Sequence, residues 1–222
     1  MKPILLGRFF YYNLYLLFNM ENITGIIIAF ISGVFGPISV MYIKHLLEKR
    51  KPKPDMVTEA LRVGEMVTNR IDHIREEFNA DRVWITQFHN GGNFYPTGKS
   101  IAKFSIIYET VNLNVNSIQS NLKNIPVNLF SRSINQLLSN DVIEINDFKD
   151  ETIATWGLKY FAEDTGTKST YQFAIKTIDD KFIGTLGIDF TKRKTKLDME
   201  SINHLMNHAS SLGGVLMNHL RC

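Results

Sequence analysis

The sequence predicts an α+β fold, a single domain of mixed helices and strands that follows one transmembrane helix. Two observations carry this prediction. Residues 23–43 form an uncharged apolar stretch, and residues 55–222 change between helical and strand-like hydrophobic periodicity. A chain of 222 residues, of which 44% are hydrophobic, has room for one such domain and an anchor. We therefore divide it into a segment of uncertain status (1–22), a span (23–43), a basic stalk (44–54) and a domain (55–222).

The predicted span runs from Ile23 to Ile43 and contains no charged side chain. At about 1.5 Å per residue, it matches the roughly 30 Å of a bilayer's hydrocarbon core. The alternative is a helix buried inside the soluble domain, but such a helix normally keeps a polar face. Gly25, Ala29 and Gly33 are four apart, which would let two spans approach closely or would simply reflect tolerance of glycine.

Positive charge follows the span and predicts its orientation. Basic residues near a span stay on the cytoplasmic side, so we expect a single-pass protein whose C-terminal domain is cytoplasmic. The stalk lysines and arginine should lie at the surface of the lipid bilayer: Lys44, Lys49, Arg50, Lys51 and Lys53. Lys2 and Arg8 argue more weakly for the opposite orientation. Either Met1 or Met20 could be the start, because the anchor is complete from Glu21 onward.

The remaining sequence predicts the elements of the domain in order. Asp55 caps a helix that continues to Ala80, because apolar residues step by three and four along it. A turn signal at His89–Gly92 separates two strands. Thr195 and Asp198 introduce the closing helix like a capping box. The other expected elements are strands at 82–88, 100–111 and 142–145, helices from 126 to 140 and from 152 to 161, and a hairpin of 170–178 and 182–190.

Two runs carry a resemblance to a known family. YQFAIKTIDDKFIGTLGIDF, followed by TKLDMESINHLMNHASSLGGVLMNHL, resembles the closing hairpin and helix of a GAF domain, and FSRSINQLLSNDVIEINDFKD resembles its middle part. The resemblance implies a central antiparallel sheet with helices on both faces, a homodimer built through the first and last helices, and a pocket for a small-molecule ligand. The cyclic-nucleotide signature is absent, and Cys222 cannot replace the cysteines on which bilin-binding relatives depend.

The candidate ligand-binding residues cluster after the first strand and on the short helix. His89 and Asn90 precede two glycines that would let a ligand approach the backbone, although a glycine-rich surface turn is the alternative. Trp156 and Tyr160 lie where relatives cover the pocket, or they belong to the core. The full set is His89, Asn90, Phe94, Tyr95, Lys103, Tyr108, Trp156 and Tyr160.

Several function classes are disfavoured by what the sequence lacks. It contains no G-x-S-x-G, P-loop or H-E-x-x-H motif, so we expect no enzyme, and the cofactor stays unknown. His204 and His208 have a chelating spacing, but they lie off the apolar stripe and no carboxylate or cysteine joins them in a ligand motif, so we expect a solvated flank and no metal. A net charge of +3 predicts no nucleic-acid partner.

These features predict a membrane-anchored, non-enzymatic sensory or partner-binding module. The alternative is a small phage or mobile-element membrane protein, such as a holin or a membrane scaffold, in which the span acts and the domain regulates.

Overall fold

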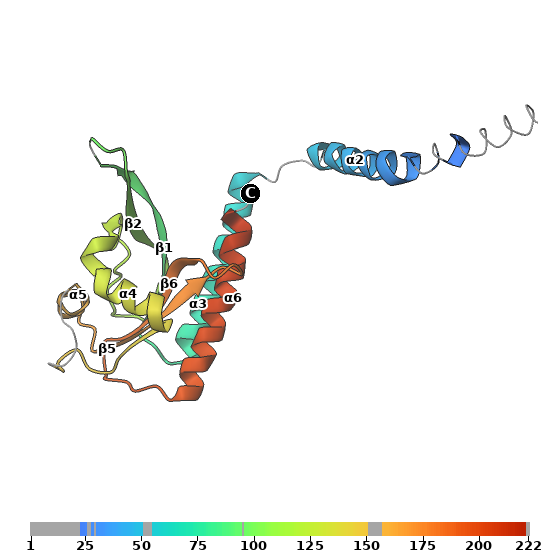
Figure 1. Ribbon diagram of the computed structural model, residues 1–222. Helices are drawn as coiled ribbons and strands as arrows, with labels where there is room; N and C mark the ends of the chain where they lie inside the picture. The colour runs from blue at the N-terminus through green and yellow to red at the C-terminus, as the bar shows by residue number, and fades with distance from the viewer. Residues whose placement is uncertain are drawn as a thin grey trace, which may run out of the picture. The chain divides into compact units, whose positions relative to one another are not determined.

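The computed structural model describes residues 23–25, 28, 30–50, 55–94, 96–150 and 157–220, in two compact units, Met1–Pro54 and Asp55–Cys222. In the first unit, the π-helical turn η1 (Ile31–Phe35) leads into α2 (Gly36–Arg50) (Figure 1). No helix among the described residues combines the length and the apolar character needed to cross a membrane. Residues 26, 27 and 29 of the predicted span, the segment 1–22 and stalk residues 51–54 lie outside the described residues.

The second unit is built on a six-stranded sheet in the order β3-β2-β1-β6-β5-β4, and every pairing in it is antiparallel. The strands are β1 (Arg82–Asn93), β2 (Ser100–Val111), β3 (Ile125–Pro126), β4 (Val142–Ile145), β5 (Ser169–Lys176) and β6 (Phe182–Phe190). The predicted α+β class with a central antiparallel sheet is therefore confirmed. β1 and β6 are its central strands, so their side chains face both layers of the domain.

Helices α3 (Met56–Glu77) and α6 (Met199–Leu220) lie side by side on one face of the sheet (Figure 1). Ile71 of α3 and Leu205 of α6 are fully buried in one core cluster with Phe173 of β5. Local capping starts both helices, because Asp55 accepts the N–H of residue 58 at 3.1 Å and Asp198 accepts that of residue 201 at 2.8 Å. The capping box expected from Thr195 and Asp198 is not formed, because Asp198, and not Thr195, accepts a backbone N–H of the first turn of α6.

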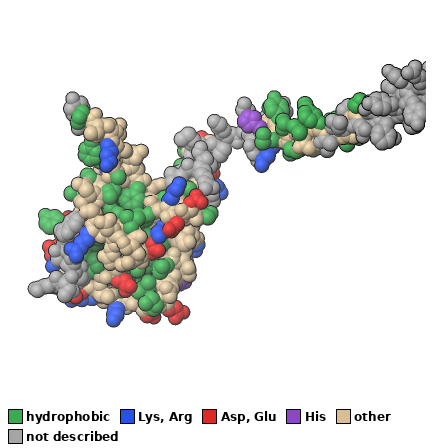
Figure 2. Space-filling model, viewed as in Figure 1, with side chains coloured by type: hydrophobic (Ala, Val, Ile, Leu, Met, Phe, Trp, Pro, Cys, Tyr) green, Lys and Arg blue, Asp and Glu red, His purple; other side chains and the backbone are tan. Residues whose placement is uncertain are grey.

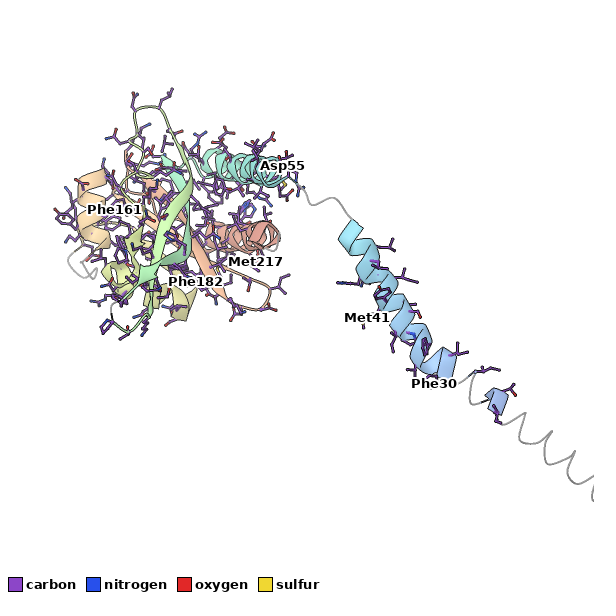
Figure 3. All side chains as sticks on the ribbon, turned by 90° about the horizontal axis from the view of Figure 1, so that it is seen from above. Phe30, Met41, Asp55, Phe161, Phe182 and Met217 are labelled. Atoms are coloured by element: carbon purple, nitrogen blue, oxygen red, sulfur yellow. The ribbon has the colours of Figure 1, made fainter. Side chains whose placement is uncertain are left out.

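The opposite face is covered by η2 (Val127–Phe130), α4 (Ser131–Asn140) and α5 (Leu158–Thr165). Figure 3 shows the layers from above, with Phe161 of α5 on one side of the sheet and Met217 of α6 on the other. Two smaller apolar clusters fill this second layer. One forms around Leu137 and Phe148, and the other around Trp84 and Phe104.

The hairpin of β1 and β2 is longer than the sequence indicates. The predicted turn at His89–Gly92 is wrong, because β1 continues to Asn93 and the chain reverses between Phe94 and Lys99, where the N–H of Phe94 bonds the carbonyl of Lys99 at 2.8 Å. Gly91 serves close packing within the strand. A Cβ there would lie 2.3 Å from Cδ of Lys103 on β2.

Candidate functional site

The alternation of β1 directs three side chains toward the layer of α4 and α5. Val83 and Ile85 point into the core under α3 and α6, whereas Trp84, Thr86 and Phe88 belong to the other face. Neighbouring strands add polar side chains at the same level, and the second-layer helices add apolar ones. The result is a cavity between the sheet and these helices.

The cavity has a volume of about 50 Å³. A single water needs about 10–15 Å³ on this measure, so the space holds several waters or a ligand of a few heavy atoms. Its apolar lining is Trp84, Phe88, Phe104, Leu122, Phe130, Ile134, Leu137, Phe148, Leu158, Phe161 and Ala162. Its polar lining is Thr86, Ser133, Thr167, Thr170, Gln172, Thr185 and Asp189.

Aromatic packing shapes the apolar part. The Phe104 ring meets that of Phe130 edge to face, with centroids 5.4 Å apart, and Phe88 meets Phe182 at 4.9 Å. Gly187 of β6 makes room for Trp84, because a Cβ at that position would lie 2.1 Å from the indole ring. The glycine therefore leaves space for the indole ring against β6.

A buried network closes the polar end. Asp189 Oδ2 accepts bonds from Arg82 Nε at 2.9 Å and from Trp84 Nε1 at 3.0 Å, and its Oδ1 accepts the Thr170 hydroxyl at 2.6 Å. Arg82 Nη2 lies 2.8 Å from the same carboxylate and also donates to the Thr167 hydroxyl at 2.8 Å. Arg82 is 0% exposed and Asp189 is 3% exposed. This carboxylate is therefore fully occupied by protein donors and fixes the orientation of the indole.

A second carboxylate stands behind this network. Glu109 Oε1 lies 4.0 Å from Arg82 Nε, and it accepts the backbone N–H of Ile118 at 2.8 Å. The formal charges of Arg82, Asp189 and Glu109 sum to −1. Among the described lining residues there is no Lys or Arg, so the cavity offers no cation to a phosphate or a free carboxylate.

Gln172, Thr185 and Ser133 are the polar lining residues that remain to receive a ligand. The Gln172 side chain is mostly buried, and among the described residues its amide has no hydrogen-bonding partner. It can both donate and accept. The Thr86 hydroxyl is already used by the Thr185 backbone N–H at 3.1 Å, while the Thr185 hydroxyl lines the space. The cavity can therefore orient one polar end of an otherwise apolar molecule.

The residues singled out from the sequence lie elsewhere in the domain, and none of the described ones lines this cavity. His89 Nε2 pairs with Ser105 Oγ at 2.9 Å, and Lys103 packs beside it in the hairpin. Asn90 and Phe94 are exposed, and Tyr160 is 79% exposed on α5. Tyr95 and Trp156 lie outside the described residues. A ligand-binding role for this set stays a prediction.

A bulge in β2 gives Tyr108 a different position from the other predicted ligand-binding residues. Ile85 pairs with Tyr108 and Thr86 with Ile106, so Ile107 is an extra residue in β2. The extra residue turns Tyr108 to the face of α3, where burial raises the pKa of its hydroxyl. One cavity residue had a usable signal in the sequence, because Gln172 lies between the large apolar side chains of Tyr171 and Phe173.

Comparison with known proteins supports a GAF-like fold. No protein-family model matches the sequence, and no curated protein sequence matches it either. Among solved structures, the chain resembles the phycocyanobilin-bound GAF domain from a cyanobacterial phytochrome, at 15% identity and a TM-score of 0.55, over 77% of this chain and 98% of that one. The blue-light absorbing form of the Thermosynechococcus elongatus PixJ GAF domain matches at 13% identity and a TM-score of 0.57, over 72% and 87%.

A third match is the GAF domain region of a protein from Geobacter sulfurreducens PCA that is described as a candidate membrane protein. Its identity is 14% and its TM-score 0.55, over 72% of this chain and 97% of that one. At identities of this size the likeness establishes the fold alone.

Proposed function

We propose that this chain is a membrane-anchored, non-enzymatic sensory module that binds a small, uncharged and mostly apolar molecule between its sheet and the helices α4 and α5. The cavity carries this proposal, because it is lined mainly by aromatic and aliphatic side chains and presents the Gln172 amide to an occupant. The GAF-like fold supports it, since the phytochrome domain it resembles is bound to phycocyanobilin.

The charges around the cavity define the ligand class. A phosphate or carboxylate placed beside Asp189 would meet a net negative charge and no lining cation, and burying it unpaired is strongly unfavourable. A neutral molecule with one polar group loses little solvation free energy on entering. Phenol is a simple probe of this class, and because it is larger than the space of about 50 Å³, its entry requires the aromatic side chains to move.

The test compares thermal midpoints of the full chain with phenol and with cyclic GMP. We expect phenol to raise the midpoint and cyclic GMP to leave it unchanged. Ala162→Leu fills the cavity from α5 and should abolish the phenol effect, whereas Ala102→Leu, the same change at an exposed site of β2, should preserve it. An equal phenol shift in both variants would place binding elsewhere.

Membrane anchoring is supported by the uncharged residues 23–43 and the basic stalk. Gly33→Lys would place a charge at the centre of the span at a cost of about 2.5–3.5 kcal/mol, so it should move the chain from the membrane fraction to the soluble fraction. Leu113→Lys, at a residue 88% exposed in the domain, is the matched control. A wild-type chain that is recovered without detergent would refute the anchor.

The orientation has an independent test. Cys222 is the only cysteine of the chain, so a membrane-impermeant maleimide reports where the C-terminus lies. A cytoplasmic domain should be labelled only after the cells are opened. Labelling of intact cells would reverse the assignment.

A homodimer is part of the proposal because α3 begins with an exposed apolar pair. Val57 and Leu61 are four apart on this helix and are 65% and 70% exposed. A second copy of the helix would cover them. Leu61→Glu should therefore halve the mass in solution, whereas Ile178→Glu, at an exposed hairpin site, should not. A wild-type monomer would remove the dimer from the proposal.

A further inference from the structure

Three potential metal ligands converge where the end of α3 meets the first turns of α6. Glu77 is the last residue of α3, and His204 and His208 are one turn apart on α6. His204 Nδ1 lies 3.0 Å from Glu77 Oε1, and His208 Nε2 lies 3.5 Å from Glu77 Oε2. One ligand atom from each residue can be chosen so that all three lie within 4.8 Å of one another.

His208 points to a missing partner. The residue is 7% exposed, and its Nε2 is buried without a hydrogen bond among the described residues, since Glu77 Oε2 is distant for one. An orphaned buried nitrogen costs about 1–3 kcal/mol, so natural proteins rarely leave one. The orphaned atom faces the carboxylate that His204 also approaches. A cation held between the three groups would satisfy it.

The donor set and its spacing suit a transition metal. Zinc binds imidazole nitrogen and carboxylate oxygen at about 2.0–2.2 Å, which puts tetrahedral ligands roughly 3.3 Å apart. The two distances, 3.0 Å from His204 to Glu77 Oε1 and 3.5 Å from His208 to Glu77 Oε2, lie near that value, each to a different oxygen of the carboxylate. Calcium and magnesium prefer oxygen ligands, so two imidazoles exclude them as the natural occupants.

The surroundings leave room for a fourth ligand. Glu77 and His204 also line a polar hollow of about 260 Å³ with Phe78, Asp198, Glu200 and Ser201. A water molecule can reach the ion from this hollow, and its two further carboxylates favour a cation. The positive charge of Arg70 near His208 disfavours a cation at this site. His73 lies outside the three ligands, with its Nε2 3.8 Å from Glu77 Oε2, beyond hydrogen-bonding distance.

We propose that Glu77, His204 and His208 bind one zinc ion, with water as the fourth ligand, and that this ion clips α3 to α6. The role is structural, because the ligands join the first and last helices of the domain on the sheet face opposite the cavity. The proposal is independent of any ligand in that cavity.

The experiment measures zinc binding to the purified full chain after chelator dialysis. Competition against a chromogenic chelator gives the affinity and stoichiometry, and thermal scans with and without zinc give the stabilisation. We expect one zinc per chain and a higher thermal midpoint. His204→Ala and Glu77→Gln should each weaken binding about 100-fold, and both sites are accessible enough for the fold to persist.

His45→Ala supplies the matched control, because it removes an exposed histidine of α2 in the other unit. It should leave zinc affinity unchanged. The zinc-free midpoints of His204→Ala and wild type should agree, which separates loss of a ligand from loss of the fold. Cobalt in place of zinc should give the strong visible absorption of a four-coordinate ion. No zinc binding by wild type, or binding that survives His204→Ala, overturns the proposal.

Discussion

Replacing Asp189 by asparagine tests whether the polar end of the cavity is a buried charge network. The change keeps the shape of the side chain but removes the charge that compensates Arg82, which is 0% exposed. It also turns one of the two acceptor oxygens into a donor, so that either Arg82 and Trp84 lose the acceptor Oδ2 or Thr170 loses the acceptor Oδ1. We therefore expect a large loss of stability.

The size of that loss follows from the contacts. Removing one partner of a buried ion pair costs about 3–5 kcal/mol, because the other charge stays buried without compensation. Glu109, 4.0 Å from Arg82 Nε, supplies part of the missing negative charge. We place the cost near the lower end, at about 3 kcal/mol, which corresponds to a drop of about 6–12 °C in the thermal midpoint for a domain of this size.

Urea unfolding followed by tryptophan fluorescence is the suitable assay, because Trp84 is 6% exposed and donates to Asp189. The urea midpoint should fall with an unchanged slope. Asp180→Asn is the control: Asp180 is 82% exposed, it has a positive φ that asparagine tolerates, and its loss should change stability by no more than about 0.5 kcal/mol. A loss below about 1 kcal/mol in Asp189→Asn would show that water reaches Arg82 and that the network is open.

Two further predictions use the same assay. Gly213→Ala should destabilise the domain by about 1–3 kcal/mol, because its Cβ would lie 2.2 Å from the carbonyl oxygen of Lys176. Gly214 has open space around it, so Gly214→Ala should stabilise the domain by about 0.5–1 kcal/mol. A change of the same sign in both variants would contradict this packing. Burial alone would raise the pKa of Asp81, but two backbone N–H groups after β6 hold it below its ordinary value of 3.8. The stabilising effect of the Asp81 carboxylate is therefore complete above about pH 4 and is lost as the pH falls through the lowered pKa. Asp81→Asn should flatten the acid limb of the curve of stability against pH. An unaltered acid limb would refute the role given to Asp81.

Local signals predicted several elements well, because capping and periodicity depend on neighbours in the chain, but among the described residues the helix expected at 152–161 is α5, Leu158–Thr165. Asp55 was expected to start the first long helix of the domain, and it does so through a bond to the third residue beyond it. The expected bounds of β2 and β4 agree with those in the structure. The turn was misplaced because His89–Gly92 has the composition of a turn, while the close packing of Gly91 against Lys103 is visible only once the two strands are paired.

The cavity was harder to predict because its walls come from opposite ends of the domain. Trp84 and Asp189 are 105 residues apart in sequence and meet only because β1 pairs with β6. The bulge at Ile107 in β2 decides which side chains of that strand face the cavity, and no property of Ile107 itself marks it. Polar residues in a buried strand were the available signal. Gln172, between Tyr171 and Phe173, is the clearest case, since a polar side chain inside a sheet needs a partner or a ligand.

The cluster of Glu77, His204 and His208 was also hard to predict from the sequence, because its residues come from two different helices. From the sequence of α6 alone, a solvated flank was the reasonable interpretation, because the apolar stripe passes through Leu205 and Ala209. That interpretation is wrong for His208, which lies next to the stripe and is buried where α3 packs against α6. The carboxylate that lies near both histidines is Glu77, at the end of α3, and the sequence of α6 cannot reveal it. The proposed zinc site depends on the packing of these two helices, and the loss of zinc binding in Glu77→Gln is the result that only this packing predicts.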